Sequence, residues 1–184
     1  MTKRWLLLAC LALCPTPLLA TGTELPPSPG VGDLPPQHLG NDRAGDPIDL
    51  ANYRGKVAIV TFWASWCGYC RKELPVLDHF QDVVGRDALE VIAVNDRESR
   101  SEFLGMIRAN RKLELTWVYD PNGRTSDQYG IDTLPHMFIL GPDGKVAFAH
   151  DGYSQTDLPG IIEQVLSLLP DAVKNRPAGT VTSY

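Results

Sequence analysis

Two thiols in the sequence, Cys67 and Cys70, are spaced to close a small disulfide or to open into a dithiol. An apolar run precedes Cys67, a helix-like pattern follows Cys70, and the other cysteines all lie within residues 1–14. At the start of a helix, unpaired N–H groups and the helix dipole favour a negatively charged sulfur. Because the thiolate is the nucleophile in disulfide exchange, we predict that Cys67 attacks a substrate and Cys70 resolves the mixed disulfide.

Two other uses of this cysteine pair have to be weighed. Half of a zinc site would need two further ligands, and the four histidines of the chain show no ligand spacing. A purely structural disulfide would close so short a loop that little entropy is removed from the unfolded chain. Redox chemistry is therefore the favoured interpretation, and it requires no metal and no organic cofactor.

The first twenty residues have the pattern of a secretory signal. Lys3 and Arg4 supply the charge, residues 5–13 the apolar segment, and residues 18–20 a cleavage site whose Leu18 is larger than usual. An uncleaved membrane anchor and a lipid-modified Cys10 are the alternatives. We expect export to the periplasm or another extracytoplasmic space, which leaves the redox pair as the only cysteines of the mature chain.

The composition is that of a soluble, mildly acidic domain. Asp and Glu number 22 against 17 Lys and Arg, for a net charge of −5, and no basic stripe is present, so nucleic acid is excluded as a partner. An exported chain without further cysteines must depend on a hydrophobic core, and this chain is long enough to form one.

Composition also divides the chain into four parts. Residues 1–20 form the expected signal, and 21–36 form a spacer rich in proline and glycine. Residues 37–170 form the folded domain, and residues 171–184 a flexible tail.

Within the domain, apolar runs alternate with amphipathic segments. We expect strands at residues 57–63, 89–95, 115–119, 136–140 and 145–150, and helices at 67–85 with a kink at Pro75, 99–110, 125–129 and 158–169. Residues 49–56 indicate a short helical or turn segment, and Ser99 with Glu102 indicates a capping box. Strands that alternate with helices and end in a hairpin predict an α/β fold, a three-layer sandwich in which helices flank a central mixed sheet.

Several motifs in a fixed order identify the chain with a family. They are Leu50–Lys56, Phe62–Cys70, Arg71–Pro75, Tyr129–Ile131 followed by Leu134–Pro135, and Phe138–Gly144. Over roughly residues 32–169 the chain resembles the thioredoxin superfamily, and within it the exported thiol-disulfide oxidoreductases of the TlpA, ResA and CcmG type. The resemblance implies a thioredoxin fold and a redox-active disulfide between the two central cysteines.

The same resemblance implies a substrate-binding groove. Pro135 would be a cis-proline lying against the dithiol, where the backbone of Leu134 pairs with an extended substrate segment. Trp66, Gly68 and Tyr69 would complete the groove beside the cysteines. The alternative for Pro135 is an ordinary proline at the entry of a strand.

Two departures from thioredoxin itself concern proton transfer. Thioredoxin has a buried aspartate where this chain has Thr61, whereas Glu73 matches a glutamate of the TlpA and ResA branch. One helical turn separates Cys70 from Glu73, so this carboxylate is a candidate catalytic group that handles protons at the resolving thiol. The alternative is a surface glutamate paired with Arg71 or Lys72.

Three further positions near the cysteines carry expectations. Thr133 stands where many relatives have glycine, which alters the loop before Pro135. His136 stands where relatives often have threonine, and it either tunes the thiolate or simply packs in its strand. Trp63 is expected in the core.

These observations predict a monomeric enzyme, a protein-disulfide reductase. Its expected partners are disulfide-containing proteins, for example in cytochrome c maturation, and a membrane thiol-electron carrier that restores the dithiol. Gly68 and Tyr69 lack a histidine that would stabilise the thiolate, which favours a reductant over a disulfide-donating oxidant. A peroxidase is disfavoured because residues 64–66 lack the proline and threonine that would cradle a peroxide. A binding domain without catalysis would not need both cysteines.

Overall fold

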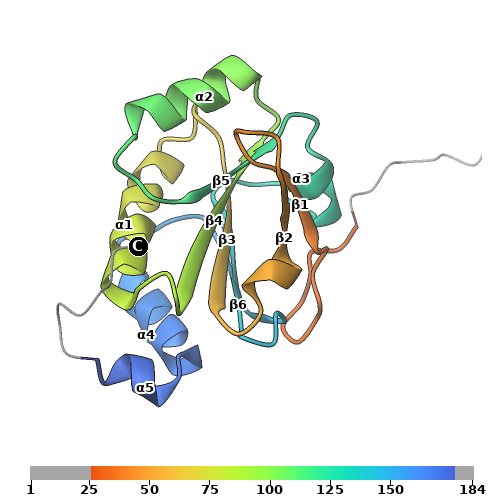
Figure 1. The fold of residues 1–184 in the computed structure, drawn as a ribbon. Coiled ribbons are helices and arrows are strands. Elements are labelled where there is room, and N and C mark those ends of the chain that lie inside the picture. Colours follow the sequence, from red (N-terminus) through yellow and green to blue (C-terminus); the bar gives the residue numbers. More distant parts are fainter. Residues whose placement is uncertain (1–25, 177–184) are drawn as a thin grey trace, which may run out of the picture.

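The computed structural model describes residues 26–176, so the expected signal and the end of the tail lie outside the described residues. The described chain folds around one mixed sheet with helices packed against it (Figure 1). The strands are β1 His38–Asn41, β2 Pro47–Asp49, β3 Val57–Trp63, β4 Leu89–Asp96, β5 Thr116–Asp120, β6 His136–Leu140 and β7 Val146–Asp151. The helices are η1 Leu50–Tyr53, a 3-10 helix, and α1 Cys70–Val84, α2 Arg100–Ala109, α3 Arg124–Gln128, α4 Leu158–Leu168 and α5 Asp171–Lys174.

The sheet has the strand order β2-β1-β5-β4-β3-β6-β7. Strands β3, β4 and β5 run parallel to one another, β6 is antiparallel to β3, and β7 is antiparallel to β6. Every residue of β3 is buried, as expected for a strand covered on both faces. The predicted α/β fold with a central mixed sheet is therefore confirmed.

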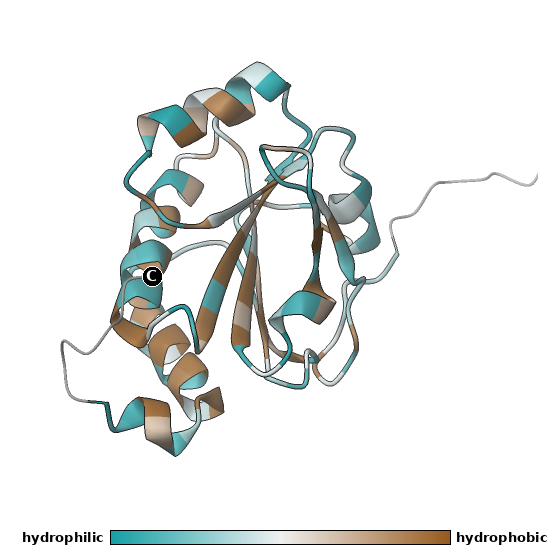
Figure 2. Ribbon diagram, in the orientation of Figure 1, coloured by the Kyte–Doolittle hydropathy of each residue, from teal (hydrophilic) through white to brown (hydrophobic). Residues whose placement is uncertain are grey.

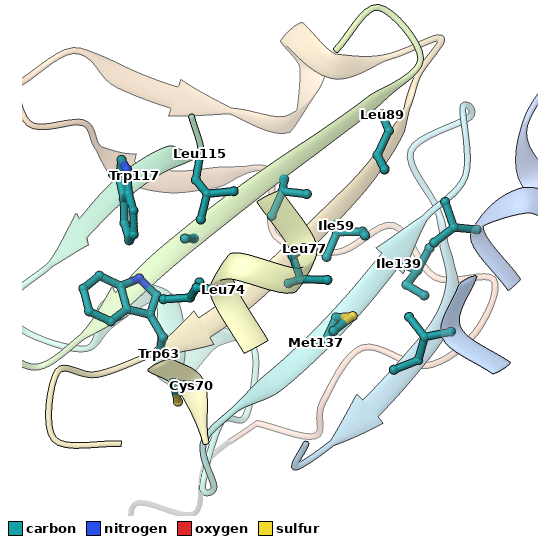
Figure 3. Packing of buried hydrophobic residues seen from close by; sticks show 14 of the residues in the cluster. Ile59, Trp63, Cys70, Leu74, Leu77, Leu89, Leu115, Trp117, Met137 and Ile139 are labelled. Carbon is teal, nitrogen blue, oxygen red and sulfur yellow. The ribbon is translucent and has the colours of Figure 1, made fainter. Parts of the chain in front are cut away.

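Each face of the sheet carries its own apolar cluster. Alternate side chains of β3 point to opposite faces, so Ile59 and Trp63 enter one cluster while Val60 and Phe62 enter the other. Helices α1, α2 and α4 cover the first face, and Figure 3 shows Leu74 and Leu77 of α1 packed over the strands. Figure 2 shows the hydrophobic residues gathered on the strands and on the inward sides of the helices.

The predicted elements agree with the structure except at three places, the third being the start of the expected tail. The strand at 57–63 and the capping box of Ser99 and Glu102 are both present as expected. The expectation that the helix begins at Cys67 is wrong, because α1 begins at Cys70 and the two preceding residues form a turn. The hairpin of β1 and β2 was not predicted.

The described part of the expected spacer contacts the sheet. The N–H of Gly32 donates to the carbonyl of Val146 at 2.8 Å, and the N–H of Val146 donates to the carbonyl of Asp33 at 2.9 Å. These two bonds fix residues 32–33 beside the edge strand β7.

The beginning of the expected tail is likewise attached to the domain. It forms the short helix α5, and Arg176 donates to Asp87 over 2.9 Å between Nη1 and Oδ1. Among the helices of residues 26–176, none combines the length and the apolar character needed to cross a membrane.

Candidate active site

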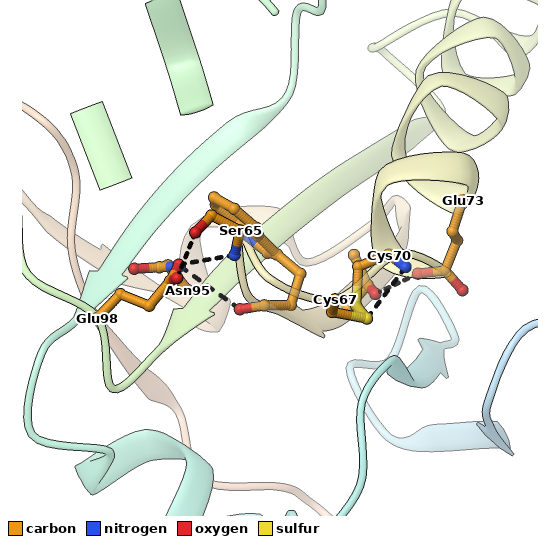
Figure 4. The surroundings of a disulfide bond; sticks show 8 residues. Ser65, Cys67, Cys70, Glu73, Asn95 and Glu98 are labelled. Carbon is orange, nitrogen blue, oxygen red and sulfur yellow. Dashed lines mark hydrogen bonds between the residues drawn. A yellow bond between two sulfur atoms is a disulfide. The ribbon is translucent and has the colours of Figure 1, made fainter. Parts of the chain in front are cut away.

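A disulfide joins Cys67, in the turn that follows β3, to Cys70, the first residue of α1. The N–H of Cys70 points to Sγ of Cys67 at 3.1 Å (Figure 4). This N–H belongs to the helix start, where the helix dipole is positive, so it will stabilise a negative charge on Cys67 once the disulfide opens. Cys67 is 5% exposed and Cys70 is fully buried, so the more accessible cysteine is also the one whose thiolate the helix favours.

Backbone hydrogen bonds hold Cys67 against the helix. Its N–H donates to the carbonyl of Ala64 at 3.1 Å, and its carbonyl accepts from the N–H of Arg71 at 3.2 Å. Although α1 begins at Cys70, Cys67 thus remains bonded to the first turn. The expected electrostatic advantage of Cys67 survives the correction of the helix start.

Glu73 lies beside Cys70 (Figure 4) and is almost completely buried, at 1% exposure. One carboxylate oxygen accepts a hydrogen bond of 2.8 Å from Oγ1 of Thr61 on β3. Burial raises the pKa of Glu73 to about 7, and the bond from Thr61 opposes that rise only in part. The alternative of a surface glutamate is wrong, since Arg71 and Lys72 are exposed and form no ion pair with Glu73 in the described chain.

The chemistry available to Glu73 follows from that pKa. A carboxyl group that titrates near neutral pH is present in both protonation states there, so it can accept a proton and return it. Glu73 lies one helical turn after Cys70, and its bond from Thr61 on β3 shows that its side chain faces the sheet. It is therefore suited to proton exchange with the resolving thiol.

A second buried carboxylate, Glu98, lies near the cysteines in the loop between β4 and α2. It is 5% exposed and accepts three hydrogen bonds. The N–H and the Oγ of Ser65 donate over 2.8 and 2.5 Å, and Nδ2 of Asn95 donates over 2.6 Å. Sequence reasoning missed Glu98, because no local pattern in the sequence indicates its contact with Ser65.

Two aromatic side chains frame the disulfide at the surface. Trp66 is 71% exposed and Tyr69 is 60% exposed, which is unusual for such large apolar groups. Lys72 lies over the ring of Tyr69 at 5.6 Å from its centroid. Trp63, by contrast, is fully buried in edge-on contact with Trp117, so the expectation that it belongs to the core is confirmed.

The segment with Pro135 reaches the same end of the sheet. The peptide bond between Leu134 and Pro135 is cis, as the family resemblance implied. Phe62, near the end of β3, pairs with His136 at the start of β6. The chain before β6 therefore lies at the edge from which the cysteine turn emerges, with Leu134 half-buried and Thr133 exposed.

His136 packs inside its strand. It is 6% exposed, and its ring stacks on Phe138 at 4.7 Å between centroids. Its Nδ1 lies 2.6 Å from Oδ1 of Asp151, without hydrogen-bond geometry. Burial lowers the pKa of His136 and the charge of Asp151 opposes this, so the structure supports the packed interpretation of this residue.

Comparison with known proteins places the chain in a family. Residues 31–149 match the model of the AhpC/TSA family. The thiol-disulfide oxidoreductase ResA of Geobacillus thermodenitrificans (strain NG80-2) is 30% identical over 118 residues, which are 63% of this chain and 66% of that protein. The sporulation thiol-disulfide oxidoreductase A of Bacillus subtilis is 33% identical over 105 residues, 55% of this chain and 62% of that protein.

A solved structure has the same fold over most of the described chain. A crystal structure from Chlorobium tepidum, described as a thiol:disulfide interchange protein DsbE, superposes with a TM-score of 0.71 at 30% identity. The match covers 77% of this chain and 99% of that one. The chain spans just under two thirds of the length of the two sequence relatives.

Proposed function

The chain belongs to the AhpC/TSA family, and from this membership and the geometry of its disulfide we propose that it is a thiol-disulfide oxidoreductase that reduces disulfides of other proteins. The observation that carries the proposal is the 3.1 Å bond from the N–H of Cys70 to Sγ of Cys67. It identifies the sulfur whose thiolate the fold stabilises. The names of the two relatives, both thiol-disulfide oxidoreductases, support the same activity.

The reaction proceeds in two exchange steps. The thiolate of Cys67 attacks one sulfur of the substrate disulfide; a mixed disulfide forms, and the other substrate sulfur leaves as a thiolate that takes up a proton. The thiol of Cys70 then loses its proton and attacks Sγ of Cys67. The mixed bond breaks, the second substrate thiol is released, and the two electrons of the dithiol have passed to the substrate.

Glu73 accepts the proton of Cys70 in the second step. Its pKa of about 7 matches the task, because a base near neutral pH is both available and strong enough. Thr61, which donates to the carboxylate of Glu73, orients that group against β3. Glu73 is thus the third catalytic residue beside the two cysteines.

Substrate binds across the exposed aromatic rings of Trp66 and Tyr69. Gly68 between them leaves room for a substrate backbone, and Leu134 with Pro135 offers an edge for an extended segment. This exposed surface suits an unfolded or flexible chain around a disulfide.

The sequence and the relatives support a proposal for the cellular setting. The protein is exported, acts outside the cytoplasm and receives electrons from a membrane thiol-electron carrier. The preparation of apocytochrome c for haem attachment is the assignment that the resemblance to ResA favours. The expected signal lies in residues 1–25, outside the described part of the chain.

Peroxide reduction is a weaker candidate for this chain. Residues 64–66, directly before Cys67, contain no threonine or proline to bind a peroxide. The one hydroxyl group there, on Ser65, donates to Glu98, as does the N–H of the same residue. Both donors of Ser65 are therefore already engaged.

Trapping of the mixed disulfide tests the proposal. Reduced full-length protein carrying Cys70→Ala is mixed with oxidised apocytochrome c and, separately, with insulin as a general disulfide substrate. Because the second step cannot occur, we expect a covalent adduct through Cys67 that a reducing agent releases. The matched control, Cys67→Ser with Cys70→Ala, should form none. Absence of an adduct with both substrates would refute disulfide reduction.

A further inference from the structure

Glu98 has a bonding pattern that the proposed reaction does not use. Its carboxylate accepts all three of its hydrogen bonds from two residues, Ser65 and Asn95. No salt bridge formed by residues 26–176 includes it. A buried carboxylate without a cation is costly, and hydrogen bonds from well-placed donors are what offset that cost.

The residues that donate to Glu98 come from the segment before Cys67 and from the end of β4, and one of them also approaches the end of β3. Ser65 stands two residues before Cys67, and Asn95 lies near the end of β4. The amide of Asn95 also approaches the carbonyl of Trp63, at the end of β3, at 3.5 Å. Figure 4 shows this group on one side of the disulfide and Glu73 on the other.

The segment held by Glu98 leads directly to the nucleophile. The carbonyl of Ala64 accepts from the N–H of Cys67, and Sγ of Cys67 accepts from the N–H of Cys70. A shift of residues 64–66 would therefore move Cys67 away from the donor that stabilises its thiolate. Hydrogen bonds of this kind weaken steeply with distance and angle.

We propose that Glu98 is a positioning residue that fixes the segment before Cys67, and so keeps Sγ of Cys67 in front of the N–H of Cys70. The inference deepens the proposed function, since it concerns the reactivity of the same nucleophile. Glu98 does so through its hydrogen bonds and not through its charge.

Two conservative variants separate a role of Glu98 through its hydrogen bonds from a role through its charge. In Glu98→Gln the side-chain oxygen can accept from the N–H of Ser65 and from Asn95, while the new amide donates to the Ser65 hydroxyl, which also accepts. The bonds persist and the charge is gone. In Glu98→Asp the charge persists, but the side chain is one methylene shorter and cannot reach both partners.

The experiment measures alkylation of Cys67 in the reduced full-length chain. Iodoacetamide is applied at several pH values, and the modified Cys67 peptide is quantified by mass spectrometry. We expect Glu98→Asp to react about tenfold more slowly near pH 7, with the pKa of the thiol raised, which corresponds to about one pKa unit. Glu98→Gln should retain most of the rate. Glu163→Gln, at an exposed position of α4, is the matched control.

The outcomes separate positioning from the other roles. A carboxylate that acted by charge would oppose the thiolate, so Glu98→Gln would speed alkylation while Glu98→Asp stayed normal. A merely structural role would lower the melting temperature without moving the thiol pKa. Either result, or equal losses in both variants, would overturn the proposal. If a Glu98 variant fails to fold, Ser65→Ala decides, and an unchanged rate there would also overturn it.

Alkylation does not depend on the proposed function. Iodoacetamide reads the state of Cys67 whether or not the protein reduces protein disulfides. Suppose that Glu98→Asp slows alkylation and Glu98→Gln does not, as expected, but that the trapping experiment fails. The positioning role would then stand, and only the reductase activity would be refuted.

Discussion

Two buried carboxylates lie on opposite sides of the disulfide, and they are bonded very differently. Glu98 accepts three hydrogen bonds, whereas Glu73 accepts one, from Thr61, at 2.8 Å. Burial with a single donor raises the pKa of Glu73 to about 7. The difference agrees with the proposed roles, in which Glu98 positions a segment through its hydrogen bonds and Glu73 exchanges a proton.

Each carboxylate lies near a different cysteine, and its bonding suits what that cysteine has to do. Glu98 holds the segment before Cys67, the sulfur that must be oriented and ionised. Glu73 lies one turn after Cys70, the sulfur that must lose its proton during the reaction. The comparison can be tested at each cysteine and at Glu73.

The largest expected effect separates the two thiols. In the reduced protein at limiting iodoacetamide, Cys67 should be labelled roughly a hundredfold faster than Cys70, because it is more exposed and has the helix-start N–H beside it. Peptide mapping measures the ratio. Labelling under denaturing conditions is the control and should remove the preference. Faster labelling of Cys70 in the folded chain would reverse the assigned roles.

The next effect concerns the stability of the oxidised protein and sharpens the contrast at Glu73. The folded chain keeps this carboxyl protonated up to a pKa of about 7, while the ordinary value is 4.5. The contribution of Glu73 to the free energy of unfolding is therefore greatest at low pH and falls as the pH rises from about 4.5 to 7, in total by about 3 kcal/mol. Glu73→Gln lacks this loss.

Urea unfolding at pH 4 and pH 8 measures that contribution. The free energy of unfolding of Glu73→Gln, relative to the unmodified protein, should rise by about 3 kcal/mol between the two pH values. Glu163→Gln, an exposed carboxylate removed in the same way, serves as the control. If the difference in free energy of unfolding between the variant and the unmodified protein does not change with pH, the pKa of Glu73 is the same in the folded and the unfolded chain, and the prediction is wrong.

The smallest expected effect is kinetic. With Glu73→Gln, release of substrate from the mixed disulfide should slow about tenfold or more and lose its inflection near pH 7, because no carboxylate accepts the Cys70 proton. Attack by Cys67 should be much less affected. Single-turnover reduction of a model disulfide across pH gives both rates. An unchanged pH profile would assign proton transfer to water.

Much of this architecture could be predicted from the sequence. The almost continuously apolar run of Val57–Trp63 predicted a buried strand, and the spacing of Ser99 and Glu102 predicted a capping box. Strong periodic or capping signals of this kind act between near neighbours. The short strands β1 and β2, at four and three residues, carry no such pattern and depend on pairing with distant segments.

The site shows the same limit. The cysteine pair and the cis peptide bond before Pro135 were expected from the motifs. The burial of Glu73 was undecided, because it depends on the fit of α1 against Thr61, twelve positions earlier. Glu98 was missed because its partner Ser65 lies 33 positions away and no local pattern announces the contact.

The position of Glu98 next to Ser99 has a further consequence for the engineering of this chain. Ser99 is the N-cap of α2 and shares a reciprocal pair of hydrogen bonds with Glu102. Ser99 caps the helix and the adjacent Glu98 accepts hydrogen bonds from Ser65, so these two residues connect the start of α2 to the segment before Cys67. Surface loops usually tolerate inserted tags and domains. The loop between β4 and α2 is a poor choice for an insertion, because a longer loop would displace Glu98 and break its hydrogen bonds to the segment before Cys67.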